Sequence, residues 1–261
     1  MIKVNGQVII IDHFGDGTLK CDAVDDAILS GRNVNVIEWM YDNESELFAV
    51  MCLARDIQQR FPDARLGLCM PYIPNARQDR RVSGRLFTLE TFAEIINLVN
   101  FSFVSVLDPH SEESEKYIKR LDKMISPSLE LEVMTAASSP NTMVMFPDAG
   151  AEKKYGMPST AIVGKKTRDE SGRISSYELV NFVDGTENVL IRDDICSYGG
   201  TFVAAAKALR ERGVKNIKLL VSHCEDNILK GEVFDYIDEV ITTDTTCKVE
   251  HPKLRIVDRF R

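Results

Sequence analysis

Two neighbouring acids before a glycine-bearing loop are the part of the sequence best suited to chemistry. Asp193 and Asp194 follow the apolar run Val189–Ile191, and the loop Ser197–Gly199 leads into the helical pattern Gly200–Glu211. Ligands of open α/β sheets bind beyond the carboxyl ends of strands, and such a loop presents free N–H groups to a phosphate. Because adjacent carboxylates accept hydrogen bonds from sugar hydroxyls, the segment predicts a ribose-phosphate site. An ordinary turn with surface acids is the alternative.

A second segment concentrates donors for a polyphosphate. The run Pro71–Arg81 follows the predicted strand Arg65–Met70 and carries Arg77, Gln78 and Arg80. Guanidinium groups bind phosphate oxygens through paired hydrogen bonds. A solvated basic loop is the other interpretation of such a cluster.

Single polar groups end two further predicted strands. His110 lies just beyond Phe103–Leu107, and Asp148 lies just beyond Met143–Phe146. A carboxylate in the position of Asp148 can cap the following helix or bind Mg²⁺ together with substrate phosphates, and the two roles are compatible.

Two cations follow the predicted strand Thr160–Val163. Lys166 and Arg168 lie on what the pattern predicts to be a loop, and the polar stretch Asp169–Tyr177 is expected to form a mobile flap. Cations on such a loop could neutralise charge that develops during group transfer. A solvated charge run is the alternative.

The elements that position these groups alternate between apolar strands and amphipathic helices. This alternation predicts an α/β fold with two mostly parallel sheets, each flanked by helices. The other predicted strands are Val8–Ile11, Val34–Glu38, Asn188–Arg192, Ile217–Val221 and Glu239–Thr242, and the other predicted helices are Glu44–Arg60, Leu86–Val99, Ser111–Leu121, Ala149–Tyr155 and Asn227–Ile237. The stretch Ile125–Leu131, with Pro127, is the best candidate for a domain boundary.

Composition narrows the classes of function. The chain has 261 residues and a net charge of −8, which disfavours nucleic-acid binding because that needs a basic surface. No apolar run reaches the length of about 18 residues expected of a membrane span. The six cysteines show no CxxC spacing and are predicted to be free thiols. We therefore expect a cytoplasmic protein, and we see no secretory leader at its start.

The segments together resemble the ribose-phosphate pyrophosphokinase (phosphoribosyl pyrophosphate synthetase) family. Asp193 and Asp194 with the loop before the helix are similar to the phosphoribosyl pyrophosphate motif, which type I phosphoribosyltransferases share; the positions that match are Asp193, Asp194, Gly199, Gly200 and Thr201. Ser197 and Tyr198 replace the Asp and Thr of the family's loop. Pro71–Arg81 resembles the family's PYxxYARQDR segment, with Asn75 in place of a tyrosine.

The resemblance implies a role for each matching residue. ATP would be bound by Phe14, Asp16, Arg77, Gln78, Asp79, Arg80 and His110, the ribose phosphate by Asp193, Asp194, Ser197, Tyr198, Gly199, Gly200 and Thr201, and Mg²⁺ by His110 and Asp148. Lys166 and Arg168 would be catalytic. Residues 1–126 would form the ATP-binding half and residues 127–261 the ribose-phosphate-binding half, each with a fold like that of type I phosphoribosyltransferases. By itself, Phe14–Gly17 is better interpreted as a hairpin turn.

The family's reaction transfers diphosphate from ATP to the 1-hydroxyl of ribose 5-phosphate. Because Ser197 and Tyr198 alter the loop that holds the sugar's 5-phosphate, an extended ribose such as ADP-ribose is an alternative acceptor. A type I phosphoribosyltransferase and a non-catalytic regulatory partner of a synthetase are further alternatives, disfavoured by the ATP segments and by Lys166 and Arg168.

The segments that resemble the family begin at about Phe14, so we expect the family's first strand and helix to be missing. Because the family's counterpart of Phe14–Gly17 contacts a neighbouring subunit's ATP, the resemblance also implies a homodimer or a larger homo-oligomer.

Overall fold

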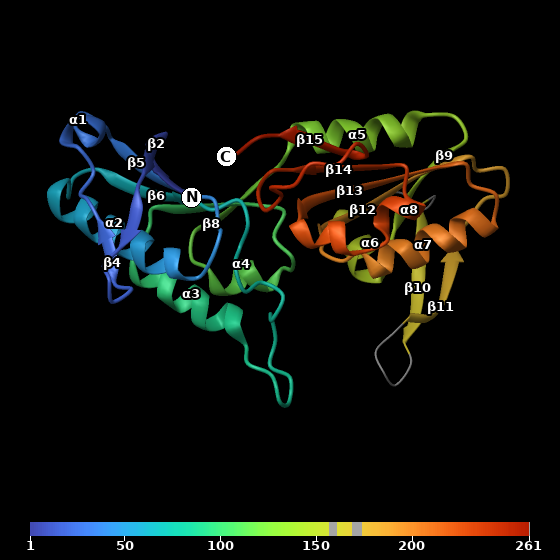
Figure 1. The fold of residues 1–261 in the computed structure, drawn as a ribbon, viewed down its shortest axis with the longest axis horizontal. Helices are drawn as coiled ribbons and strands as arrows, with labels where there is room; N and C mark the ends of the chain where they lie inside the picture. The colour runs from blue at the N-terminus through green and yellow to red at the C-terminus, as the bar shows by residue number, and fades with distance from the viewer. Residues whose placement is uncertain (157–160, 169–173, 261) are drawn as a thin grey trace. The chain divides into compact units, whose positions relative to one another are not determined.

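The computed structural model describes residues 1–156, 161–168 and 174–260, without the side chains of Arg168 and Ile174. The chain divides into two compact units, Met1–Ile125 and Ser126–Phe260, each built around a sheet of its own (Figure 1). Both sheets are mostly parallel and are flanked by helices, which confirms the predicted α/β class.

The first unit contains a six-stranded sheet in the order β2-β1-β5-β6-β7-β8 and a separate β3–β4 hairpin. Strands β5 to β8 are parallel, and β1 and β2 extend the sheet in antiparallel fashion. Its elements are β1 Ile2–Val4, β2 Gln7–Ile9, β3 Ile11–His13, β4 Leu19–Cys21, α1 Asp26–Leu29, β5 Val34–Trp39, α2 Ser45–Arg60, β6 Arg65–Cys69, α3 Thr88–Leu98, β7 Phe103–Leu107, α4 Glu113–Tyr117 and β8 Leu121–Met124.

Packing in this unit brings the ends of β6 and β7 together. Gly67 in β6 lies against the ring of Phe103 in β7, where a Cβ would come within 2.1 Å of the ring. Beyond the strand ends, the Leu107 amide donates to the Pro71 carbonyl over 2.8 Å. The loops that follow β6 and β7 therefore start side by side at the carboxyl edge of the sheet.

The second unit contains a seven-stranded sheet in the order β11-β10-β9-β12-β13-β14-β15, in which β11 alone is antiparallel to its neighbour. Its elements are α5 Pro127–Ser138, β9 Thr142–Phe146, α6 Ala149–Tyr155, β10 Ile162–Arg168, β11 Ile174–Val180, β12 Asn188–Cys196, α7 Gly200–Glu211, β13 Asn216–Cys224, the 3₁₀ helix η1 Asp226–Lys230, α8 Val233–Tyr236, β14 Glu239–Thr243 and β15 Leu254–Asp258.

Helices cover both faces of this second sheet. Because successive strand side chains point to opposite faces, Leu190 packs in one apolar cluster with Leu129 of α5, while Ile191 packs in another with Phe202 of α7. Figure 1 shows α5 and α7 on opposite faces of the sheet. With both faces buried, β9, β13 and β14 contain apolar runs that the sequence predicts as strands, whereas β11 and β15 were not predicted.

Two predicted helices are wrong in extent. Ser111–Leu121 contains only the short helix Glu113–Tyr117, because Leu121 begins β8. Asn227–Ile237 is interrupted at Gly231, whose backbone is extended and passes so close to Tyr198 that a Cβ would lie 2.0 Å from that residue's carbonyl oxygen.

The structure describes all six cysteines and the lengths of the helices. The six cysteines are free thiols, as predicted. Within the described ranges no helix combines the length and the apolar character that crossing a membrane requires.

Candidate active site

The two acids lie inside β12, not after it as the sequence suggested, because the strand continues to Cys196. Its last residues pair with β13, a strand of equal length. Asp194 is only 5 % exposed, and its backbone amide donates to Asp193 Oδ1 over 2.9 Å. Both residues therefore lie in the carboxyl-terminal part of a central strand, where Asp194 is buried and Asp193 is half-buried.

Burial, together with the charges of Asp194 and Asp148, raises the pKa of Asp193 to about 8. A carboxylate pair with little access to water resists double ionisation. Close approach of a cation or of sugar hydroxyls would favour the ionised form. The site is thus prepared to bind a partner that supplies positive charge or donors.

Asp193 should make stability depend on pH. Its pKa is raised when folded, so its contribution is complete below its unfolded pKa, near 3.8, and is lost as pH rises toward about 8. We expect the free energy of unfolding to fall by about 1.4 kcal/mol per pH unit in that window. Urea unfolding at several pH values should show this slope in the wild type and little of it in Asp193→Asn.

A suitable control for this measurement is Asp184→Asn. The side chain of Asp184 is 91 % exposed, so its removal should leave the slope unchanged. Equal slopes in the wild type and in Asp193→Asn would show that folding does not raise the pKa of Asp193.

Asp148 and Lys166 form an ion pair beside the acids. Asp148 caps α6, because its Oδ1 accepts from the amides of Gly150 and Ala151 over 3.0 and 3.1 Å, and its Oδ2 accepts from Lys166 Nζ over 2.7 Å. Burial opposes ionisation of Asp148, but the hydrogen bond and charge of Lys166 and the two amides hold its pKa below the ordinary value. The predicted capping role is confirmed.

Lys166 does not lie on a loop, as the sequence suggested, but within β10. Residues Gly164–Arg168 pair with β11, which was not predicted because its first residues, Ile174–Tyr177, were assigned to the polar flap. The first residues of β11, Ile174–Tyr177, belong to the segment that the sequence predicted as a flap. Asp169–Arg173 and the side chain of Arg168 fall outside the described residues.

Two residues near this site were missed by sequence reasoning. Lys154 of α6 places Nζ 4.0 Å from Asp194 Oδ1, and the Tyr177 hydroxyl of β11 donates to the Pro147 carbonyl over 2.8 Å. A signal for Lys154 was available, since a buried acid pair calls for a nearby cation. Tyr177 had none, because its contact crosses a neighbouring strand.

The loop before α7 is closely packed. Gly199 has a φ of 75°, in the left-handed region, and a Cβ there would lie 2.0 Å from Val233 Cγ2. No acidic residue occupies the first turn of α7, whose N-terminal amides are suited to an anion. Tyr198 keeps 56 % of its surface exposed. The loop thus combines an anion-binding helix end with an accessible aromatic ring.

In the first unit, Asp79 connects the two predicted ATP segments. It is 5 % exposed and accepts from Arg80 Nε over 3.0 Å. Burial opposes its ionisation, but Arg80 and the charge of His110 hold its pKa below the ordinary value. Arg77, Gln78 and Arg80 are exposed. The loops after β6 and β7 therefore bring Arg80 and His110 to one edge.

Phe14–Gly17 forms the turn of the β3–β4 hairpin, the interpretation that the segment favours by itself. The Asp16 carboxylate accepts from the amide and the hydroxyl of Thr18, and Gly17 has a φ of 83°. Phe14 is 57 % exposed at the tip. Asp16 thus holds the turn, and the ring of Phe14 is the group free to contact a ligand.

The donors fit Mg²⁺ better than a softer metal. In the described parts of the chain, no three His, Cys, Asp or Glu side chains are arranged to hold a metal ion. Mg²⁺ is commonly bound by one or two carboxylates, with substrate phosphates and water completing its shell. Asp148 and the pair Asp193–Asp194 supply carboxylates of this kind, so the residues fit an ion that arrives with a polyphosphate.

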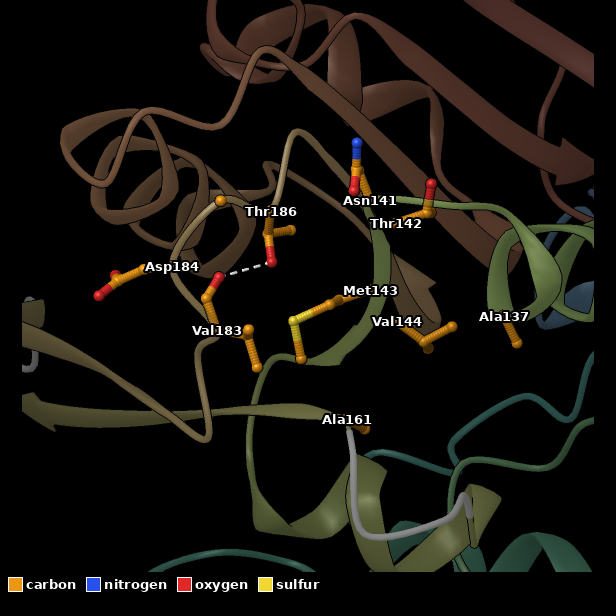
Figure 2. A pocket seen from close by; sticks show the side chains of 10 residues that line it. Ala137, Asn141, Thr142, Met143, Val144, Ala161, Val183, Asp184 and Thr186 are labelled. Carbon is orange, nitrogen blue, oxygen red and sulfur yellow. Dashed lines mark hydrogen bonds between the residues drawn. The ribbon is translucent and has the colours of Figure 1, made fainter.

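A cavity of about 440 Å³ lies elsewhere in the second unit (Figure 2). It is lined by residues that precede or begin strands β9, β10 and β12, among them Asn141, Ala161 and Thr186, whose hydroxyl donates to the Val183 carbonyl over 2.7 Å. None of the predicted site residues lines it. The candidate site is at the other end of these strands.

The fold is that of a phosphoribosylpyrophosphate synthetase. A crystal structure of that enzyme from Mycobacterium smegmatis matches with a TM-score of 0.71 over 96 % of this chain and 85 % of the other, at 22 % identity. No family model matches the chain.

Curated relatives carry the corresponding name. Ribose-phosphate pyrophosphokinases of Marinomonas and Vibrio cholerae are each 28 % identical, over 82 % and 90 % of this chain and 71 % and 77 % of their own lengths. The one from Sulfurisphaera tokodaii is 24 % identical over 88 % of this chain and 82 % of its own. The predicted resemblance is confirmed: the chain is a divergent relative of ribose-phosphate pyrophosphokinases and, by this relationship, an enzyme of the diphosphotransferase class.

Proposed function

We propose that the chain transfers diphosphate from ATP to the 1-hydroxyl of ribose 5-phosphate. The observation that carries the proposal is the cluster at the carboxyl edge of the second sheet, where the Asp148–Lys166 ion pair lies beside the acids of β12. Such a cluster suits a reaction that depends on positioning and charge neutralisation and needs no protein nucleophile.

Each substrate has its own set of residues in this proposal. Arg77, Gln78, Asp79, Arg80 and His110 of the first unit bind ATP, whose adenine the Phe14–Asp16 turn contacts. Asp193 and Asp194 accept hydrogen bonds from the ribose hydroxyls. The amides of the loop Ser197–Thr201 hold the 5-phosphate at the start of α7.

The transfer is an in-line displacement at the β-phosphorus of ATP. The 1-oxygen of the sugar forms a bond to this phosphorus, the bond from phosphorus to the α,β-bridging oxygen breaks, AMP leaves, and the hydroxyl proton passes to solvent. Lys166 and Arg168 stabilise negative charge on the transferred group and on the departing AMP. Mg²⁺, for which Asp148 would supply a carboxylate, would neutralise phosphate charge.

Release of AMP should depend on both the sugar and the metal. With purified protein, ATP and Mg²⁺, we expect AMP to appear only when ribose 5-phosphate is added and to stop when excess EDTA removes the metal. Chromatography of the nucleotides measures this directly. AMP formed at the same rate without a sugar would argue for hydrolysis and against the transfer.

The exposed ring of Tyr198 favours ADP-ribose as a second candidate acceptor. ADP-ribose carries the same free 1-hydroxyl but extends beyond its 5-phosphate, and a ring that is 56 % exposed beside the phosphate loop can stack on the added group. The chemistry would be the same, and the product would be ADP-ribose pyrophosphate.

Replacing Tyr198 with threonine separates the two acceptors. Loss of one stacking contact should raise KM for ADP-ribose about 5- to 100-fold and leave KM for ribose 5-phosphate nearly unchanged. Steady-state kinetics with each acceptor provides the comparison, and ribose 5-phosphate serves as the internal control. An equal change for both sugars would mean that Tyr198 shapes the loop and does not recognise an extension.

We also propose a cytoplasmic homo-oligomer, a dimer or larger. The exposed Phe14 at the hairpin tip supports this proposal, because the corresponding turn of the family serves the ATP site of a neighbouring subunit. Light scattering of the purified chain tests it, and a monomer at working concentration would oppose it.

A further inference from the structure

Tyr177 and Gly164 form an unusual pair across β10 and β11. Tyr177 lies directly opposite Lys166 in the antiparallel register, so both side chains point to the same face of the sheet. Gly164, two residues before Lys166, occupies a position on that same face. The tyrosine ring passes over Gly164, where a Cβ would come within 2.0 Å of the hydroxyl oxygen. Because Gly164 has no side chain, the Tyr177 ring can cross β10 and its hydroxyl can reach the segment beyond that strand.

The hydroxyl ends on the segment that carries Asp148. It donates to the carbonyl of Pro147 over 2.8 Å, and Pro147 immediately precedes Asp148. Burial raises the pKa of Tyr177 far above its ordinary value, and the charges of Asp148 and Asp193 act in the same direction. The group therefore remains a donor at every pH at which the protein would work.

Two neighbouring side chains of one face thus hold two consecutive residues. Tyr177 holds the carbonyl of Pro147, and Lys166 holds the carboxylate of Asp148 over 2.7 Å. The first contact fixes where the β10–β11 ribbon lies relative to the start of α6, and the second depends on that placement.

We propose that Tyr177 is a positioning residue for diphosphate transfer, because its hydroxyl sets the register between the strand that carries Lys166 and the loop that carries Asp148. The inference rests on the proposed function for its catalytic consequence. Its structural part stands independently, because the ion pair exists whatever the substrate is.

The variant Tyr177→Phe removes only the hydroxyl and keeps the ring that packs in the core of the second unit. The matched control is Ser176→Ala, next in the same strand, exposed and on the opposite face. A melting curve for each variant verifies that the fold persists.

The first readout is the rate at which an amine-acylating reagent labels Lys166, followed by peptide mass spectrometry. In the wild type, pairing with Asp148 and an exposure of 23 % protect this amine. Labelling of Lys166 should rise about five-fold in Tyr177→Phe, the factor given by loss of one hydrogen bond. Lys165, exposed on the other face of β10, should be labelled at an unchanged rate. Equal Lys166 labelling in the variant and the wild type would overturn the proposal.

The second readout is steady-state kinetics with ATP and the sugar. We expect kcat of Tyr177→Phe to fall about five-fold with both KM values nearly unchanged, because the hydroxyl does not contact substrate. A change in KM alone, or no change at all, would contradict a positioning role. If the wild type itself is inactive, the proposed function fails, while the labelling of Lys166 still decides whether Tyr177 sets the register.

Discussion

Replacing Lys166 with alanine is expected to lower kcat by about 100- to 1,000-fold. Lys166 supplies the described cation that contacts Asp148, and in the proposed reaction it neutralises charge on the transferred group. Its loss also removes the hydrogen bond and charge that lower the pKa of Asp148. Steady-state rates of AMP formation measure the effect.

Lys165→Ala is the matched control for this variant. Lys165 is the adjacent residue of β10, is exposed and faces the other way, so its removal should change kcat less than two-fold. Similar losses in both variants would show that the ribbon needs positive charge in general, and wild-type activity in Lys166→Ala would remove Lys166 from the reaction. Arg168 remains a prediction from the resemblance.

Adding one methyl group at Gly199 is expected to lower the free energy of unfolding by about 2 to 4 kcal/mol. An alanine there must keep a φ of 75° and place its Cβ 2.0 Å from Val233 Cγ2. Because the loop begins α7, the same distortion should weaken binding of the sugar phosphate. Urea unfolding of Gly199→Ala gives the stability.

The neighbouring glycine provides the control for stability. Gly200 lies in the first turn of α7, and a Cβ there would meet no atom within 4 Å. Gly200→Ala should therefore be as stable as the wild type or more stable by up to about 1 kcal/mol. If Gly199→Ala were equally stable, the loop would be able to relax, and its packing against Val233 could not be what fixes it.

Much of the fold could be predicted because buried strands and capped helices leave local signals. Phe103–Leu107 and the helices Ala149–Tyr155 and Gly200–Glu211 were predicted with the bounds that the structure shows. The helix α5 was missed although Ser126, which caps it, and Pro127 at its first turn are both favourable start signals. There the signal existed and was attributed to a domain boundary.

The remaining differences arise from contacts between distant segments. The pairing that makes a strand of Gly164–Arg168 depends on β11, whose first residues were assigned to a flap. The break at Gly231 depends on the carbonyl of Tyr198, more than thirty residues earlier. In the candidate site, the sequence indicated Asp148, Asp193 and Lys166 but not Lys154 or Tyr177, whose contacts only the packed sheet creates.

The most direct test of the central claim is the mass of the product formed from ATP and a sugar phosphate. Purified protein is incubated with Mg²⁺, ATP and one acceptor, either ribose 5-phosphate or ADP-ribose, in separate reactions. The nucleotides and sugars of each reaction are then analysed by mass spectrometry. Our account predicts that one acceptor gains two phosphoryl groups for each AMP released. Formation of ADP with a singly phosphorylated sugar, or no AMP with either acceptor, would contradict it.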